Sequence, residues 1–160
     1  MLADYNQIID GRLWVGSVVR PADARQLQRM GITIVVSLQT DRDLKQHGIS
    51  REKLVRELED VSVDIRWVPV QEFDREDLIR QLPACVAAVE AALTPAWAKL
   101  YLHCSAGIIR SPTVAAAYLM KTYSMPVEKA SDILIAKRDC RPDMEVLRAY
   151  ELTLNVERET

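Results

Sequence analysis

The chain has 160 residues, of which 49% are hydrophobic and 28% charged, and its formal net charge is −2 at pH 7. This length fits a single domain covering residues 1–160, long enough to bury a substantial apolar core. The slightly negative charge argues against broad binding of nucleic acids or anionic membranes, which needs a basic excess, so any anion must be recognised locally.

The first half of the chain alternates short apolar runs with helical patterns. Proline is tolerated in a first helical turn and glycine often follows a last one, so Pro21 and Gly31 bracket a predicted helix. A β-branched run too short for a helix predicts a buried central strand, and Ser50 is placed to cap a later helix. In order, the patterns predict a strand at 13–16, a helix at 21–30, a strand at 32–38, a loop at 39–48 and a helix at 50–60.

The second half continues this alternation. Apolar side chains recur at helical spacing at Leu82, Val86 and Val89. In order, we expect a strand at 63–68, a helix at 78–93, a strand at 99–102 and helices at 110–123, 127–137 and 144–156. Strands alternating with helices indicate an α/β fold with a central, mostly parallel sheet flanked by helices. Ligands of such sheets bind beyond the carboxyl ends of strands, and residue 103 falls at such an end.

The most informative segment follows the predicted strand at 99–102. His103 and Cys104 come first, five residues containing Gly107 come next, and Arg110 and Ser111 open a predicted helix. This order sets a thiol, a ring of backbone N–H groups and a guanidinium around one point, which suits a phosphate attacked by sulfur. The residues expected to bind the phosphate are Ser105, Ala106, Gly107, Ile108, Ile109 and Arg110.

Each residue type in this segment has a chemical reason. A free cysteine has a pKa of about 8.5, so the reactive thiolate is scarce at neutral pH unless amides and a helix N-terminus stabilise it. Arg110 offers a planar fork for two phosphoryl oxygens, and Ser111 can donate a hydrogen bond to the sulfur. We expect His103 to order the loop and the thiolate rather than to transfer protons. The alternative is an ordinary strand–turn–helix with a buried structural cysteine.

The departing oxygen of a phosphate ester needs a proton, so an acid should lie on a separate loop. Residues 71–77 contain four acidic residues, of which Glu72 and Asp74 are our candidates for the catalytic acid. For each one, the alternative is a solvated residue at a helix start, where acidic side chains are favoured. Phe73 is the only phenylalanine of the chain, and it either lines the substrate pocket or packs under its own loop.

With these residues, the chain resembles the dual-specificity phosphatases of the protein tyrosine phosphatase superfamily. The segment His103-Cys104-x-x-Gly107-x-x-Arg110-Ser111 matches the family signature throughout, and the resemblance covers nearly the whole chain. It is similar in particular to plant glucan phosphatases, through Asp4-Tyr5, Val15-Gly16-Ser17, Leu38-Gln39-x-Asp41-x-Asp43, Phe73-Asp74, Gln81-Leu82-Pro83 and Lys137-Arg138-x-Cys140. The resemblance implies that Cys104 forms a phosphocysteine, which water then hydrolyses with the help of the catalytic acid.

Departures from the family pattern bear on the acid and on the substrate. The acid of the family is the first Asp of an Asp-Phe-Asp triplet, a position held here by Glu72, so Asp74 stays a second candidate. Glucan phosphatases carry glycine where this chain has Ile109. The positions of their aromatic residues hold Gln46, His47 and Arg141. We therefore expect phosphotyrosine, phosphoserine and phosphothreonine substrates, with a phosphoglucan as the alternative.

Two further hypotheses remain open at this level. The substitution at Glu72 suggests a phosphate-binding pseudophosphatase without turnover, and loops of the rhodanese type, which cradle a cysteine in sulfurtransferases, suggest sulfur transfer. The pattern of Gly107, Arg110 and Ser111 after His103 favours phosphate chemistry over both.

Cysteine and histidine usage bears on cofactors and compartment. Three scattered cysteines and two histidines form neither a disulfide framework nor a zinc-ligand spacing, so we expect no metal or other cofactor and a reducing compartment. No apolar run reaches the about 18 residues of a membrane span, and the N-terminus lacks a signal pattern. We expect a cytoplasmic monomer that acts on a phosphorylated substrate away from membranes.

Overall fold

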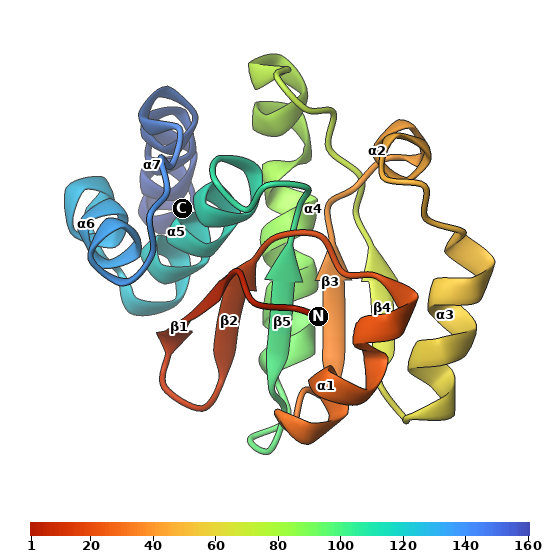
Figure 1. Cartoon of the computed structure of the whole chain (residues 1–160). Helices are drawn as coiled ribbons and strands as arrows, with labels where there is room; N and C mark the ends of the chain where they lie inside the picture. The colour runs from red at the N-terminus through yellow and green to blue at the C-terminus, as the bar shows by residue number, and fades with distance from the viewer.

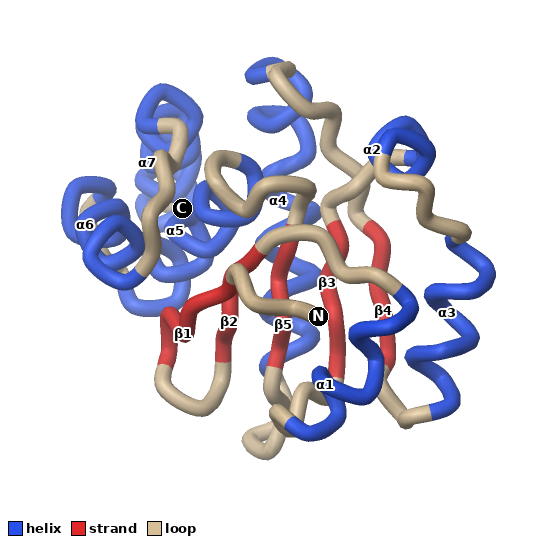
Figure 2. The backbone as a smooth tube through the Cα atoms, viewed as in Figure 1, coloured by secondary structure: helices blue, strands red, loops and turns tan.

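The computed structural model describes residues 1–160 and contains a five-stranded sheet with helices on both faces (Figures 1 and 2). The strands are β1 (Tyr5–Ile9), β2 (Leu13–Gly16), β3 (Ile34–Ser37), β4 (Asp64–Trp67) and β5 (Leu100–His103). The helices are α1 (Ala24–Arg29), which follows a 3₁₀ turn at Pro21–Asp23, α2 (Asp41–Gln46), α3 (Arg51–Asp60), α4 (Arg75–Leu93), α5 (Arg110–Tyr123), α6 (Val127–Lys137) and α7 (Met144–Glu159). None of these helices combines the length and the apolar character needed to cross a bilayer.

The strand order is β1-β2-β5-β3-β4, and all neighbouring pairs are parallel except β1 with β2. This arrangement confirms the predicted α/β fold with a mostly parallel sheet. The antiparallel edge strand β1 was not predicted, because Asn6 and Gln7 are exposed and only Ile8 is buried in it. Its apolar residues do not alternate with polar ones, so the sequence shows no clear strand pattern.

The sheet separates two apolar cores, because successive side chains of a strand point to opposite faces. On β5, Leu100 and Leu102 belong to a cluster of 32 buried residues shared with α4, α5, α6 and α7. Tyr101 between them belongs to a cluster of 13 buried residues shared with α1 and α3. In Figure 1, α4 accordingly passes behind the sheet while α1 lies in front of it. Both faces of β5 are therefore packed against apolar side chains, and this packing fixes the position of the residues that follow the strand.

The polar stretch at 39–48 contains the short helix α2, so the predicted loop was wrong there. Thr40 Oγ1 accepts a hydrogen bond from the amide of Asp43 at 3.2 Å, and the Asp43 carboxylate accepts one from the amide of Thr40 at 2.8 Å. This reciprocal capping box starts the helix. Leu44 is the only apolar side chain of α2 that is buried, and one apolar position cannot produce a helical period.

The other predicted elements are confirmed, some of them with shifted boundaries. Helix α4 begins at Arg75 rather than at residue 78, because Asp74 caps it, and α7 continues to Glu159. Strand β3 is shorter than the predicted run, beginning at Ile34.

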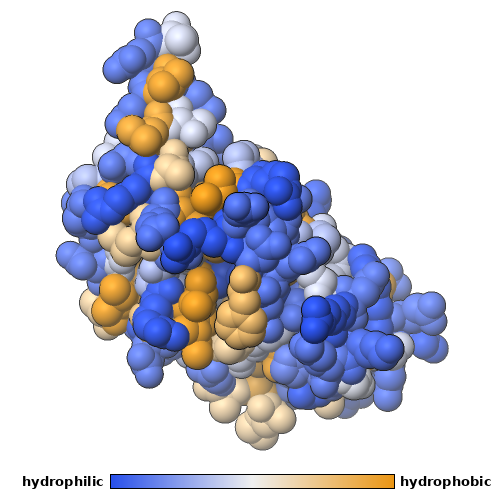
Figure 3. Space-filling model, turned by 90° about the horizontal axis from the view of Figure 1, so that it is seen from above, coloured by the Kyte–Doolittle hydropathy of each residue, from blue (hydrophilic) through white to orange (hydrophobic).

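The carboxyl ends of the parallel strands meet at the upper edge of the sheet in Figure 1. At this edge, His103 of β5 is paired in register with Gly16 of β2 and Ser37 of β3. Figure 3 looks onto the same end and shows hydrophobic groups lying among strongly hydrophilic ones. Cys104, the residue after His103, therefore follows the central strand at this end of the sheet.

Candidate active site

Cys104 follows directly after the central strand β5, at the carboxyl end of the sheet. Its side chain is 2% exposed. Its Sγ lies 3.2 Å from the amide nitrogen of Gly107 and 3.3 Å from Oγ of Ser111, which belongs to the first turn of α5. Amide donors and the positive end of a helix dipole favour an anion at this position. The sulfur therefore lies at the start of the predicted phosphate-binding loop, residues 104–110, which we call the phosphate loop or cradle.

The loop between Cys104 and Arg110 turns its carbonyl groups toward the rest of the protein. The carbonyl oxygens of residues 105–109 accept hydrogen bonds, in order, from Val18 N, Arg138 Nη2, Arg138 Nε, Arg141 N and Thr113 N. In a trans peptide the N–H group points away from the carbonyl group, so the amides of residues 106–110 face inward. Of these amides, only that of Gly107 donates to a protein atom, the sulfur. The loop is a ring of hydrogen-bond donors around Cys104.

Arg138 and Gly107 set the shape of this loop. The Arg138 side chain is 4% exposed and forms an ion pair with Asp4 at 3.0 Å in addition to its two bonds to the loop. Gly107 has a φ of +69°, and a Cβ there would lie 2.5 Å from Arg138 Nη2 and 2.6 Å from the carbonyl oxygen of Gly16. Only glycine fits both the backbone conformation and the space, as the expected tight turn requires.

The Arg110 guanidinium is buried and held along one edge. Its Nη1 donates to Oδ2 of Asp43 and to the carbonyl oxygen of Val70, both at 2.8 Å. Burial by itself would raise the pKa of Asp43, but hydrogen bonds from Arg110 and from the amide of Thr40 outweigh it, so this pKa lies below its usual range. Nη2 of Arg110 has no hydrogen-bond partner and lies 3.7 Å from Oε1 of Glu72. One nitrogen thus anchors the side chain while the other stays available to a ligand.

The segment 71–77, called the acid loop below, follows β4, includes the first turn of α4 and is held by hydrogen bonds at its ends. The amide of Gln71 donates to Oδ2 of Asp77 at 2.8 Å, and this bond is the main reason why the pKa of Asp77 lies below its usual range. The amide of Asp77 in turn donates to Oδ1 of Asp74 at 2.9 Å, which makes Asp74 the cap of α4. These bonds leave the middle of the segment facing the cradle.

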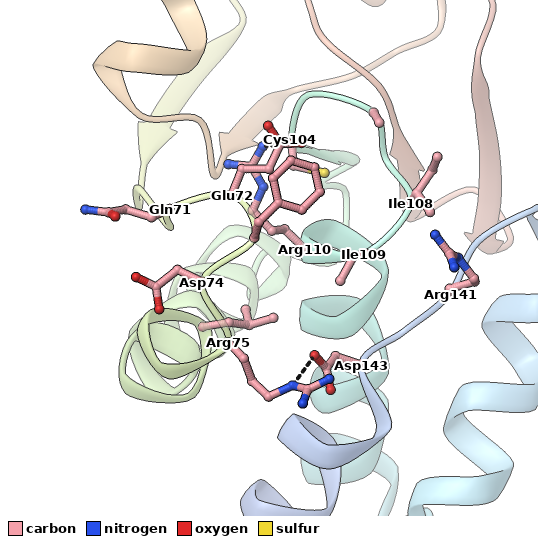
Figure 4. Close-up of a pocket in the computed structure, with 13 residues that line it drawn as sticks. Gln71, Glu72, Asp74, Arg75, Cys104, Ile108, Ile109, Arg110, Arg141 and Asp143 are labelled. Carbon is pink, nitrogen blue, oxygen red and sulfur yellow. Dashed lines mark hydrogen bonds and ion pairs between the residues drawn. The ribbon is translucent and has the colours of Figure 1, made fainter.

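The two candidate acids differ in what their carboxyl groups contact. Glu72 is 31% exposed, beside the free nitrogen of Arg110, whereas Asp74 accepts the capping hydrogen bond. In Figure 4, Glu72 lies next to Arg110 and Cys104, and Asp74 points away from them. The structure therefore brings Glu72 to the sulfur end of the site. Which residue donates the proton stays a prediction.

A cavity of about 630 Å³ opens above Cys104 (Figure 4). Phe73 borders it with a φ of +60° and a side chain that is 92% exposed, so this ring does not pack under its own loop. The cavity is lined by Gln71, Glu72, Phe73, Asp74, Arg75, Leu78, Cys104, Ala106, Ile108, Ile109, Arg110, Arg141 and Asp143. The predicted nucleophile, arginine and acid loop thus share one cavity.

His103 and Ser105 lie behind the cradle rather than in the cavity. His103 is fully buried, and its Nδ1 lies 2.8 Å from the carbonyl oxygen of Cys104, to which it donates. Burial lowers the pKa of His103 to about 4, so the imidazole is neutral at physiological pH. Ser105 Oγ accepts a hydrogen bond from Nε2 of Gln39 at 3.0 Å. This placement agrees with an ordering role for His103, which stays a prediction.

Chemical reasoning on the sequence did not single out three supporting residues, Gln39, Asp43 and Arg138. Each contacts the cradle from a distant part of the chain, and none has a spacing that reveals its role. The available signal was the family resemblance, because all three lie in the segments that carry it.

Comparison with known proteins places the chain in a family. Residues 13–152 match the family described as dual specificity phosphatase, catalytic domain. The chain is 30% identical over 149 residues to the amyloplastic phosphoglucan phosphatase DSP4 of Castanea sativa, an alignment covering 91% of this chain and 39% of that protein. It is 32% identical over 144 residues to dual specificity protein phosphatase 12 of Mus musculus, covering 90% and 38%. The chain thus spans about two fifths of the length of these relatives.

Solved structures agree with this assignment. The crystal structure of human DUSP28 superposes with a TM-score of 0.73 at 26% identity and covers 97% of both chains. PTPMT1 in complex with PI(5)P reaches 0.79 at 17% identity, covering 98% of this chain and 99% of that one, a likeness that shows the fold alone. Because the catalytic-domain match extends over most of the residues described above, this chain belongs to the dual specificity phosphatase family.

Proposed function

We propose that the protein is a cysteine-dependent phosphatase that hydrolyses phosphomonoesters of tyrosine, serine and threonine through a phosphocysteine intermediate. The observation that carries this proposal is the Cys104 sulfur at the centre of an inward-facing ring of amides, beside a partly free Arg110. A phosphate dianion matches that ring, because amides and a guanidinium supply donors to its non-bridging oxygens without moving.

In the first step, the thiolate of Cys104 attacks phosphorus in line with the ester oxygen. The S–P bond forms, the P–O ester bond breaks, and the departing oxygen takes a proton from the acid. We assign the acid to Glu72, because it neighbours Arg110 while Asp74 caps α4. Arg110 and the loop amides stabilise the charge on the transferring group.

In the second step, water attacks the phosphocysteine. The carboxylate of Glu72 accepts a proton from the water, the S–P bond breaks, and inorganic phosphate is released. The hydroxyl of Ser111, 3.3 Å from the sulfur, donates a hydrogen bond that stabilises the departing thiolate. Neither step requires a metal or another cofactor, because the phosphate charge is met by Arg110 and the amides.

The test is release of phosphate from an aryl phosphate and from phosphopeptides, with Cys104→Ser as the key variant. We expect turnover in the wild type and a loss of at least about 10³-fold in Cys104→Ser. Cys85→Ala is the control, since Cys85 is buried in α4 and does not line the cavity. Phosphate binding without turnover would indicate a pseudophosphatase, and sulfur transfer from thiosulfate would indicate a sulfurtransferase; either result would contradict the proposal.

A phosphoglucan phosphatase is the second candidate function. Two observations favour it: the similarity to the phosphoglucan phosphatase of Castanea sativa, and the exposed ring of Phe73 beside the cavity, which offers a stacking surface. Phosphate release from phosphorylated glucan and from phosphopeptides, measured side by side, separates the two. A preference for glucan by several orders of magnitude would replace the first proposal with this one.

We further propose that residues 1–160 form one catalytic domain that acts as a monomer in the cytoplasm, away from membranes. The three cysteines are free and buried, as suits a reducing compartment, and the net charge of −2 gives no attraction to anionic lipids. Light scattering of the purified chain and its localisation in cells test these points.

A further inference from the structure

Three arginines line the cavity above Cys104, and only Arg141 has no partner. Arg110 is paired with the buried carboxylate described above. Arg75 bonds two carboxylates at the start of α7, at 2.8 Å and 2.7 Å. The side chain of Arg141 is exposed and makes no ion pair or hydrogen bond. Its guanidinium is therefore the one cationic group in the cavity wall that no protein group neutralises.

Arg141 is held in place by the phosphate loop itself. Its amide donates to the carbonyl oxygen of Ile108 at 2.8 Å, and Pro142 restricts the backbone directly after it. In Figure 4, the side chain lies near Ile108, across the cavity from Gln71 and Asp74. The backbone that carries this cation is thus fixed relative to the site where the substrate phosphate would bind.

The cavity is electrically asymmetric. The carboxylate of Asp74 lies on one side and repels an anion, whereas Arg141 lies on the other. Ile108, which is 38% exposed, and Ile109 line the cavity between Cys104 and Arg141. These side chains suit uncharged atoms that connect the phosphate to a second charged group. A substrate with a second anion gains most when that anion points toward Arg141.

We propose that Arg141 binds a second anionic group of the substrate, and that the preferred substrates are phosphopeptides with an acidic or a second phosphorylated residue close to the phosphoresidue. This proposal rests on the phosphatase function and narrows its substrate class. A guanidinium forms two parallel hydrogen bonds to a carboxylate or a phosphate, so both groups fit. Neutral sugar hydroxyls have no comparable need for an unpaired cation.

The experiment compares kcat/KM for three substrates in wild type and Arg141→Gln. The substrates are p-nitrophenyl phosphate, a phosphotyrosine peptide with neutral neighbours, and matched peptides with one Asp or one phosphoserine at each neighbouring position. We expect the best acidic peptide to exceed the neutral one about fivefold in the wild type, the size of one exposed ion pair. Arg141→Gln should abolish this ratio, Arg141→Glu should invert it, and 0.5 M salt should weaken it.

Arg29→Gln is the matched control, because Arg29 is also exposed and unpaired but lies on α1, outside the cavity. It should leave the ratio unchanged. The inference would be overturned if Arg141→Gln lowered kcat/KM equally for all three kinds of substrate, or if the wild type did not prefer acidic peptides. In either case, turnover of p-nitrophenyl phosphate would still support the phosphatase function. An inositol phosphate serves as a fourth substrate, and a higher kcat/KM for it than for the acidic peptides would contradict the peptide assignment. Absence of all turnover would instead refute the phosphatase function.

Discussion

The phosphate loop and the acid loop face the same cavity, yet they are built in opposite ways. Around Cys104, every carbonyl group of residues 105–109 is bonded to the protein, and Arg110 and Ser111 are buried. In the acid loop, hydrogen bonds hold the ends while Phe73 is 92% exposed. Fixed donors stabilise a phosphate because they need no rearrangement during the reaction. The acid loop supplies one proton and borders the substrate, so its middle tolerates exposure.

The largest expected effect tests which side chain of the acid loop contacts the reaction. Glu72→Gln should lower kcat on phosphoserine peptides by about 10²–10⁴-fold, because the departing alkoxide loses its proton donor. The loss should be much smaller on p-nitrophenyl phosphate, whose product departs without a proton. Asp74→Asn is the control, since asparagine also caps helices, and should change kcat less than about threefold. Equal losses in both variants would contradict the assignment to Glu72.

A second prediction concerns the rigidity of the phosphate loop. Gly107→Ala should lower the free energy of unfolding by about 3–4 kcal/mol, because a Cβ would collide with Arg138 and the backbone of Gly16. Gly11→Ala has a similar φ of +68° but nothing within 4 Å of the added carbon, so it should cost only about 1 kcal/mol. Denaturant unfolding of both variants separates crowding from backbone strain. A similar loss of unfolding free energy in both variants would mean that the phosphate loop shifts to make room for the added carbon.

The buried His103 behind the cradle predicts how stability depends on pH. Its pKa is lowered from 6.5 to about 4 by burial, so between these values the unfolded chain binds a proton that the folded protein does not. The free energy of unfolding should therefore fall by about 3 kcal/mol as the pH drops from 6.5 to 4. His103→Gln should lack this part of the slope in urea unfolding measured across that range. An unchanged slope would show that another group causes the dependence.

The smallest expected effect concerns Asp74, which caps the N-terminus of α4. Asp74→Ala should lower the free energy of unfolding by about 1 kcal/mol, because the amide of Asp77 loses its capping acceptor. Thermal unfolding measures this loss. Asp74→Asn should retain most of the stability, and a loss as large in Asn as in Ala would argue against the capping role.

Much of the fold and the nucleophilic half of the site could be predicted, because the relevant signals are local. The cradle occupies consecutive residues, so the order of a strand, Cys104, Gly107 and Arg110 is visible in the sequence. The errors occurred where local signals were weak. Helix α2 has one buried apolar residue, and β1 is an edge strand with one fully buried side chain.

The sequence by itself determined which chemistry this protein can perform, since a thiol, loop amides and an arginine follow one another at fixed spacing. Only the tertiary structure decided how that chemistry is supported and directed. Asp43 reaches Arg110 across 67 residues, and Arg138 reaches Gly107 across 31. Packing likewise left Arg141 free while it paired Arg75 with carboxylates 68 and 70 residues away. The strength of an ion pair depends on distance and burial, and for residues so far apart in the chain both quantities arise only when the helices and strands pack together.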